Sequence, residues 1–328
     1  MKFASISARK LLRAAMLVTV ALASLTVTAW TPARGRTGLM TASGYVDHAL
    51  NVPPPPGFNP LIASDAQLRR YGFPHRPKDP KALAQWKQAM QHARQYLPPK
   101  PMPVAKWFST TGTAYSGSWA GYYVPNSGNS SGNVTETTSQ WNVPAVSSIG
   151  GSQPPDAAFW TGTGGTSSSS SGIVQAGTDS VTSNPAHYTF WTEDYPQNSV
   201  QQNNPPVNPG DNAYVDVTYN SNQTATYYLE DVTTGQYTSI TYSAPNYDGS
   251  SADYINEWTP WGLAHYGTVN FGDCLLYWAG SGSGEGDLGA YNNTQVVMTS
   301  NGLPPPLGSV LVQPSPIGSN LVSFSVSY

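Results

Sequence analysis

After residue 106 the chain consists of short stretches in which apolar and polar residues alternate, separated by Gly, Pro, Asn and Ser. Successive side chains of a strand point to opposite faces, so alternation over about four to eight residues predicts a half-buried β-strand. We expect strands over residues 119–124, 134–143, 157–161, 172–176, 187–195, 213–219, 224–231, 237–242, 253–258, 267–271, 275–278, 294–300, 309–312 and 320–327.

This pattern predicts an all-β domain. Many short strands punctuated by turn residues, with no convincing helix among them, indicate an antiparallel sandwich or barrel. About 220 residues is within the usual range for one such domain. Eight of the ten tryptophans follow Lys106, which provides large side chains for a core.

A helical pattern precedes this domain. Asp79 and Pro80 form an N-cap followed by proline at the first helical position, and apolar residues then recur at helical spacing. We expect a helix over about residues 80–97, with an apolar stripe of Leu83, Trp86, Met90, Ala93 and Leu97. Its basic residues, Lys81, Lys87 and Arg94, leave two interpretations: the helix lies on an acidic partner, or water solvates its charges. Ser64 and Asp65 could cap a shorter helix that ends at Arg70.

Charge divides the 328-residue chain into two parts. All 15 Lys and Arg lie at or before Lys106, where three Asp reduce the net charge to +12. The remaining 222 residues carry 15 acidic residues and no Lys or Arg, a net of −15. A basic segment attached to a cation-free acidic domain is expected of an acid-active zymogen, because the attraction between the parts fades as the carboxylates are protonated.

The N-terminus predicts export. Four basic residues precede the apolar run from Ala14 to Leu25, and small residues before Trp30 offer a cleavage site, as in a secretory signal peptide. The alternative is a membrane anchor, for which the run is short. We therefore expect a signal peptide over 1–29, a basic prosegment over 30–106 and a catalytic domain over 107–328, secreted into an acidic environment. The activation site is expected between Pro98 and Ser116.

The residue types of this domain exclude several kinds of chemistry. It has two histidines, His187 and His265, without the spacing of a metal site, so we expect neither metal nor cofactor. Its one cysteine, Cys274, cannot form an intrachain disulfide, and the Gly128 to Gly132 Gly-x-Ser-x-Gly match lies in a loop-type sequence. The lack of a basic patch argues against nucleic-acid binding. Acid chemistry would then depend on carboxyl and amide side chains.

Six ordered motifs carry a specific resemblance. They are Gly117-Ser-Trp-Ala-Gly121, Asn142-Val-Pro144, Phe159-Trp-Thr-Gly162, Ile173-Val-Gln-Ala-Gly177, Tyr188 through Glu193 to Tyr195-Pro196, and Ala252-Asp-Tyr-Ile-Asn-Glu257. In this order they resemble the glutamic peptidases, the eqolisin family. The resemblance implies a β-sandwich of two roughly seven-stranded antiparallel sheets and a secreted acid endopeptidase that loses an N-terminal prosegment. It also implies that Gln175 and Glu257 are the catalytic pair and that Trp160 and Glu193 belong to the substrate site.

Strand alternation supports the same residues independently. Asp253, Ile255 and Glu257 share one face of their strand, as do Trp191 with Glu193 and Ile173 with Gln175. If these faces converge, Glu257 could act as general base on a water and Gln175 could donate an N–H to the oxyanion. Trp160 and Trp191 could hold an extended peptide or pack in the core, Glu193 could have a structural role, and Asp253 could adjust Glu257.

Two rival classes stay open: a carbohydrate-binding or glycoside-hydrolysing sandwich that uses Glu193 and Glu257, and a non-catalytic surface domain. One departure from the family is Gly164, where members commonly carry an aspartate. For a peptidase, the expected partners are polypeptide substrates and the chain's own prosegment as intramolecular inhibitor. We expect a monomer that binds no membrane once the signal peptide is removed.

Overall fold

The structure is a computed structural model that describes residues 52–99, 101–103, 115–130, 132–148, 150, 154–166, 172–197, 199–258, 262–279, 284–303 and 305–328. The predicted signal peptide and the first part of the predicted prosegment lie outside these ranges. None of the helices within them is long and apolar enough to cross a membrane.

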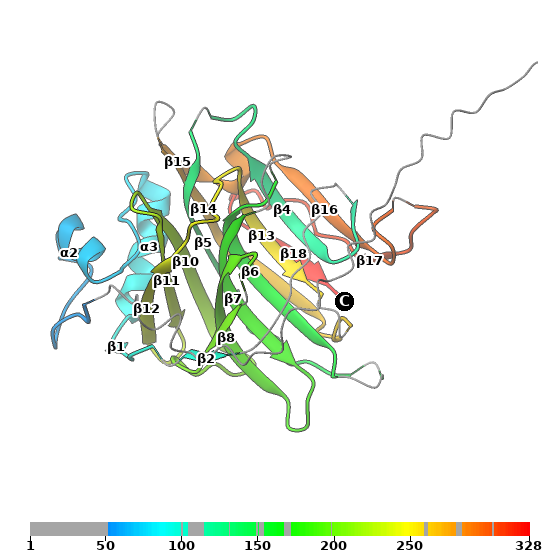
Figure 1. Cartoon of the computed structure of the whole chain (residues 1–328), viewed down its shortest axis with the longest axis horizontal. Helices are drawn as coiled ribbons and strands as arrows, with labels where there is room; N and C mark the ends of the chain where they lie inside the picture. The colour runs from blue at the N-terminus through cyan, green and yellow to red at the C-terminus, as the bar shows by residue number, and fades with distance from the viewer. Residues whose placement is uncertain are drawn as a thin grey trace, which may run out of the picture. The chain divides into compact units, whose positions relative to one another are not determined.

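One of two sheets, sheet A, is built mostly from the middle of the chain (Figure 1). Its strands, in spatial order, are β1 (Gln95–Tyr96), β12 (Gln236–Ser243), β11 (Thr224–Asp231), β10 (Asn212–Asn220), β5 (Val134–Asn142), β14 (Thr268–Trp278) and β15 (Gly284–Asp287), with β18 (Phe324–Ser327) also paired to β14. A short 3-10 helix, η2 (Leu288–Ala290), follows β15.

Sheet B carries most of the expected motifs. Its order is β17 (Val310–Val312), β16 (Thr294–Thr299), β4 (Trp119–Pro125), β13 (Ser251–Glu257), β6 (Asp156–Gly164), β7 (Ile173–Val181), β8 (His187–Tyr195), β9 (Val200–Gln202) and β2 (Pro101–Pro103), with β3 (Tyr115–Ser116) beside β16. Described neighbours pair antiparallel except β1 with β12 and β3 with β16, which are parallel. The predicted all-β sandwich is confirmed.

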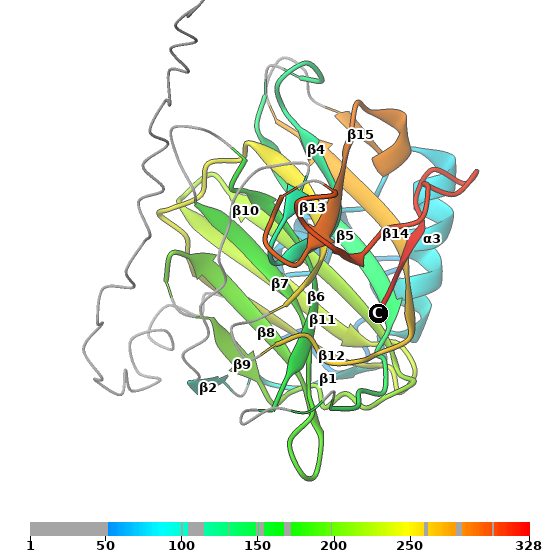
Figure 2. The same cartoon turned by 90° about the vertical axis from the view of Figure 1, so that its right-hand side faces the viewer.

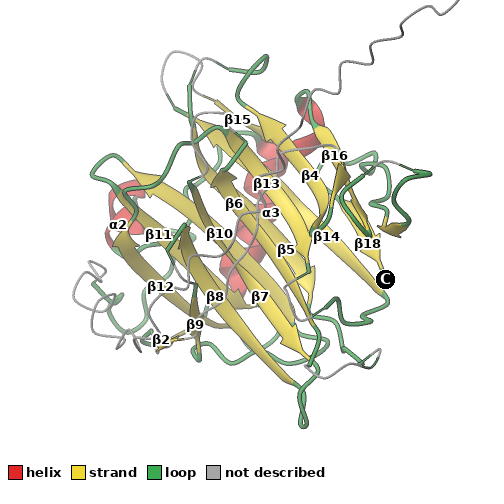
Figure 3. Cartoon of the chain, turned by 45° about the vertical axis from the view of Figure 1, so that its right-hand side comes forward, coloured by secondary structure: helices red, strands yellow, loops and turns green. Residues whose placement is uncertain are grey.

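The strands of the two sheets are shown in Figure 3. The main core joins side chains from the inner faces of both sheets. Val215 and Leu229 of sheet A and Phe159, Ala176 and Tyr254 of sheet B are fully buried members of one apolar cluster. Full burial of Val215, Leu229 or Phe159 contributes about 1.5–3 kcal/mol relative to exposure. Because this core uses one face of every central strand, the alternate side chains of sheet B point to its outer face.

We call residues 52–103 the N-terminal layer. Its helical part covers the outer face of sheet A (Figures 1 and 2), and β2 pairs at the edge of sheet B. The layer contains α2 (Asp65–Arg70) and α3 (Pro80–His92). Ser64 caps α2 in a capping box with Gln67, and the Asp79 carboxylate accepts the Ala82 N–H at the start of α3. The helix expected over 80–97 ends at His92, because β1 follows it and pairs with β12.

Apolar packing, rather than charge, holds α3 against the sheet. Trp86, Met90 and Ala93 of the predicted stripe are buried, whereas Lys87 and Arg94 are exposed. Between described residues the recorded ion pair is Arg76 with Asp65, both within the layer. The helix thus lies on the acidic domain, as one interpretation expected, but Lys87 and Arg94 keep their charges in water, as the other expected.

Strand ends differ from the expectations where sheet pairing outweighs local sequence. The expected strands 267–271 and 275–278 form one strand, β14, whose register shifts between Gly272 and Leu275. A β-bulge admits such extra residues without ending the strand. The short polar strands β9 and β15 were not predicted, because their sequences do not alternate. They form by pairing with their neighbours β8 and β14.

Several carboxyl groups are buried in the sandwich without a described cation. Burial raises the pKa of Glu230 to about 8, although the Tyr228 hydroxyl donates to it, and raises that of Asp194 to about 7. Burial also raises the pKa of Glu136 well above its ordinary value, and the neighbouring Asp216 raises it further. These groups hold protons more tightly in the folded chain than in the unfolded chain.

We therefore predict that the protein is most stable in acid. A carboxyl whose pKa is raised by folding stabilises the folded state at pH values below its pKa in the unfolded chain, which is about 4. This stabilisation is lost as the pH rises through the pKa of the folded state. Thermal melts should show a midpoint roughly 5–10 °C lower at pH 8 than at pH 4. Glu230→Gln, which cannot ionise, should lose part of this difference; an equal or higher midpoint at pH 8 would contradict the argument.

Candidate active site

The central strands of sheet B bring the predicted residues to one face. β6 lies between β13 and β7, and β8 follows β7. The register sets Asp253 opposite Gly162, Gly162 opposite Gln175, and Gln175 opposite Glu193. Directly paired residues share a face of a sheet. Gln175, Glu193 and Asp253 therefore form one row across four strands.

Two further rows run parallel to this one. Ile255, Trp160, Gly177 and Trp191 form the second, and Glu257 begins the third opposite Ala158. All six predicted site residues thus lie on one face of sheet B, and the central core occupies the other. Gln175 and Glu257 are separated by a single strand, β6. The predicted convergence of strand faces is found for this set.

Two hydrogen bonds fix the polar side chains of the site. The Trp160 indole Nε1–H donates to Glu257 Oε2 at 2.8 Å, and Gln175 Nε2 donates to Glu193 Oε2 at 2.6 Å. Burial raises the pKa of Tyr195, and the charges of Glu193 and Glu257 both raise it further. The fields of both carboxylates therefore reach the Tyr195 phenol.

Two glycines, which have no side chain, leave room for this arrangement. A Cβ on Gly162 would stand 2.6 Å from the Gln175 Cβ and 2.7 Å from the Val174 carbonyl oxygen. A Cβ on Gly177 would stand 2.7 Å from the Trp160 Cβ and closer still to backbone. Each glycine therefore admits the functional side chain of the adjacent strand.

Aromatic side chains surround the polar groups. Trp119, Trp160, Trp191 and Ile255 belong to an apolar cluster of the outer face that is separate from the central core. The Trp119 and Trp160 rings meet edge to face with centroids 5.0 Å apart. The core-packing alternative for Trp160 and Trp191 thus does not place them between the sheets; they pack on the side that carries the carboxyl and amide groups.

Asp253 differs from Glu257 in its surroundings. Its carboxyl is fully buried, and the Ser251 hydroxyl lies 3.1 Å from Oδ2. Burial raises its pKa well above the ordinary value, and the nearby charge of Asp248 raises it further. Burial therefore favours the protonated form of Asp253.

A carboxylate from another segment stands beside Gly164. Asp248 Oδ1 would lie 2.7 Å from a Cβ placed on Gly164, and it accepts N–H groups from Gly165 and Ser250. An aspartate at position 164 would also clash with the Gly172 carbonyl oxygen. The space next to Gly164 is thus supplied with a carboxylate from the loop before β13.

Asp179 is a site neighbour that the sequence argument missed. It is fully buried and lies opposite Ala158 and Thr189, on the same face as Gln175, with Gln201 Nε2 3.4 Å from its Oδ2. The sequence did contain a signal for it: Asp179 follows Gln175 by four residues, and residues an even number apart on one strand share a face. The expectation that the strand ended at Ala176 concealed it.

The remaining candidates lie apart from the polar groups of the site. His187 is on the same face of β8 as Glu193, but it lies six residues away at the exposed end of the strand, and His265 is exposed as well. Cys274 is buried in the main core, where burial raises its thiol pKa. In the part of the chain that the structure describes, no group of His, Cys, Asp and Glu is arranged to hold a metal ion. The chemistry available at the site is that of carboxyl, amide and indole groups.

Comparison with known proteins identifies the family and the fold. The model of the Peptidase A4 family matches residues 117–310. Aspergillopepsin-2 of Aspergillus niger is 26% identical over 225 residues, which cover 63% of this chain and 73% of that protein. The solved structure of scytalido-glutamic peptidase with a transition state analog inhibitor superposes with a TM-score of 0.51 at 23% identity, covering 65% of this chain and 99% of that one. At this identity the structural likeness shows the fold alone.

Glycine at position 162 is expected to be required for the fold of this face. Gly162→Ala should lower the free energy of unfolding by about 2–3 kcal/mol, because the new methyl group meets backbone and the Gln175 Cβ. Gly272→Ala is the matched control, since its Cβ would make only ordinary contact with the Gln140 side chain at 3.5 Å. Urea unfolding of both variants measures the difference; equal losses would refute the steric argument.

Proposed function

The chain belongs to the Peptidase A4 family, the glutamic peptidases, and from this premise we propose that it is a secreted acid endopeptidase that uses Glu257 and Gln175. The observation that carries the proposal is the shared face on which Trp160 fixes Glu257 and Glu193 fixes Gln175. The substrates are polypeptides in extended conformation. The aromatic cluster around the polar groups is suited to holding such a chain by apolar contact.

Glu257 is proposed as the general base. Its carboxylate takes a proton from a water as that water attacks the scissile carbonyl carbon, and then returns a proton to the leaving amine. The indole N–H of Trp160 stabilises the ionised form, because a hydrogen bond donated to a carboxylate favours the charge. An ordinary glutamate ionises near pH 4.3, so such a base serves in acid where histidine would be charged.

Gln175 is proposed to stabilise the oxyanion. Its Nε2 carries two hydrogens, and the bond to Glu193 uses one of them. The second can be donated to the oxygen that becomes negative as the water adds. A single preorganised donor of this kind contributes about 2.7–4 kcal/mol in well-studied acyl transfer. Glu193 would then be a positioning residue that orients the amide.

We also propose that the protein is made as a precursor with a signal peptide over 1–29 and a prosegment before the catalytic domain. Gln175, Glu257 and Trp160 are fully buried in the whole chain, although a peptidase must admit a peptide to these groups. The full-length protein therefore has the burial expected of a closed zymogen. The opposite charges of the two parts of the sequence agree with this interpretation.

We propose that the prosegment acts as an intramolecular inhibitor of the catalytic domain until the chain is cut between Pro98 and Ser116.

Substitution of the two proposed catalytic residues tests the function. Glu257→Gln and Gln175→Ala should each reduce cleavage of denatured casein at pH 3.5 by at least about 10²-fold, through loss of the base and of the oxyanion donor. Glu230→Gln is the matched control, because Glu230 is a buried glutamate of sheet A. Activity should persist with chelators. Release of sugar from polysaccharides with intact casein would instead favour a glycoside hydrolase.

The fixation of Glu257 by Trp160 predicts a change in pH dependence. Trp160→Phe keeps an aromatic ring but removes the N–H donor, so the ionised form of Glu257 is less stable and its pKa rises. The acidic limb of the kcat/KM profile should move up by about 0.5–1 pH unit. Trp191→Phe, which leaves the bond to Glu257 intact, should not move it. An unchanged limb in Trp160→Phe would remove this role for the indole.

A further inference from the structure

The N-terminal layer has the contacts of a structural subunit rather than of a segment that is shed. Phe73, Trp86 and Met90 share an apolar cluster with Tyr214, Tyr228 and Tyr237 of sheet A. The Phe73 ring lies 5.5 Å from that of Tyr228 and 5.2 Å from that of Tyr237, between centroids. Aromatic burial of this kind does not depend on charge, so acid does not remove it.

Backbone pairing extends the contact along two sheet edges. β1 pairs with β12 of sheet A, and the Leu97 N–H donates to the Tyr237 carbonyl at 2.7 Å. β2 pairs with β9 of sheet B, and the Asn204 amide donates to the Pro98 carbonyl at 2.8 Å. On the outer face of sheet A, the Ser239 hydroxyl donates to the Gly72 carbonyl at 2.7 Å. The layer thus supplies a strand to each sheet.

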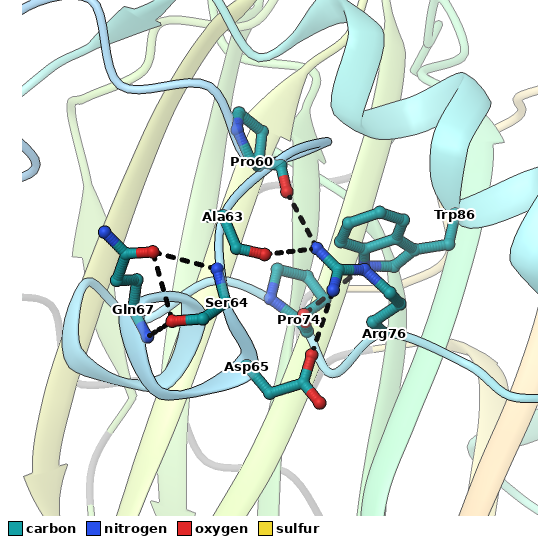
Figure 4. Close-up of polar contacts among 8 residues, drawn as sticks. All are labelled: Pro60, Ala63, Ser64, Asp65, Gln67, Pro74, Arg76 and Trp86. Atoms are coloured by element: carbon teal, nitrogen blue, oxygen red, sulfur yellow. Dashed lines mark hydrogen bonds and ion pairs between the residues drawn. The ribbon is translucent and has the colours of Figure 1, made fainter.

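The layer also has internal structure of its own (Figure 4). The Arg76 guanidinium pairs with Asp65, donates to the carbonyls of Pro60 and Ala63, and lies 5.2 Å from the centre of the Trp86 ring. The Trp86 indole in turn donates to the Pro74 carbonyl at 3.3 Å. These contacts link α2, α3 and the loop between them into one unit.

We propose that residues 52–103 remain bound to the sandwich as a second chain of the active peptidase after the connection between Pro103 and Tyr115 is cut. The proposal rests on the proposed function, which supplies the hydrolysis. One water adds across a peptide bond of the connection, leaving a carboxyl terminus on the layer and an amino terminus on the sandwich. After the cut, the layer keeps its contacts with the outer face of sheet A and, through β2, its pairing with β9 at the edge of sheet B.

The titratable groups beneath the layer permit docking in acid. The Glu136 carboxylate accepts the His75 N–H at 3.1 Å and faces Asp216 and Glu285, and Glu230 faces Asp231 and the Tyr228 hydroxyl. Acid protonates these carboxyls, so that they are buried without charge. His75, near Lys78 and Arg69, gains charge in acid, and its ring is only half-buried, so water can still solvate it.

A controlled cut tests the proposal independently of the chain's own activity. In full-length Glu257→Gln, residues 107–112 are replaced by the recognition sequence of a site-specific endopeptidase, and the chain is cut at pH 7. The two fragments should separate on a denaturing gel but co-elute on size exclusion at pH 7 and at pH 3.5. Elution of the N-terminal fragment apart from the sandwich at pH 3.5 would overturn the proposal.

Matched variants locate the contact. Phe73→Ala should release the fragment after the cut, because it removes the ring between Tyr228 and Tyr237, whereas Ile62→Ala, at a side chain that is 83% exposed, should not. Release from both variants, or from neither, would count against docking through this aromatic contact.

Wild-type protein incubated at pH 3.5 separates this proposal from the proposed function. If it is cut, mass spectrometry of the native particle should find both chains, and a sandwich without the layer would overturn the proposal. If it is not cut, the zymogen hypothesis fails, and the engineered cut still decides whether the layer stays bound.

Discussion

The site depends on the placement of β6 between β13 and β7. This strand contributes Trp160, which holds Glu257 on one neighbour, and Gly162, which admits Gln175 on the other. Trp160 and Gly162 are two residues apart on this strand, and together they determine where Glu257 and Gln175 lie. A shift of one residue in this pairing would turn Trp160 into the central core and Phe159 toward the site. The register of β6 is thus the main geometric requirement for the chemistry.

Much of this arrangement could be predicted from the sequence. Alternation with turn residues gave the all-β sandwich, because period-two patterning is a property of strands with one face in a core. The same even spacing put Asp253 with Glu257 and Trp191 with Glu193, and the ordered motifs identified the family before the structure was considered. What spacing within a strand cannot give is which strands are neighbours. The bonds from Trp160 to Glu257 and from Gln175 to Glu193 join strands through pairing that only the fold defines.

The charge pattern was a less reliable guide to contacts. The division of basic and acidic residues suggested that the two parts attract each other by charge, yet α3 turns its apolar stripe to sheet A and keeps Lys87 and Arg94 in water. Desolvation explains this outcome: burying a charge costs more than its partner returns, whereas burying Trp86 and Met90 is favourable without a partner. Charge composition describes the medium in which a protein works better than it describes which surfaces touch.

The tyrosines of sheet A's outer face have a consequence for handling the protein. Tyr214, Tyr228 and Tyr237 are each less than 5% exposed beneath the N-terminal layer. A recombinant polypeptide beginning at Trp107 would leave these three rings, with the Phe73 position vacant, open to water as one contiguous patch. Patches of this type favour self-association, so copies of the shortened polypeptide would tend to aggregate face to face even with all catalytic residues present. Low yield of the shortened form would then reflect colloidal behaviour and would not bear on its chemistry.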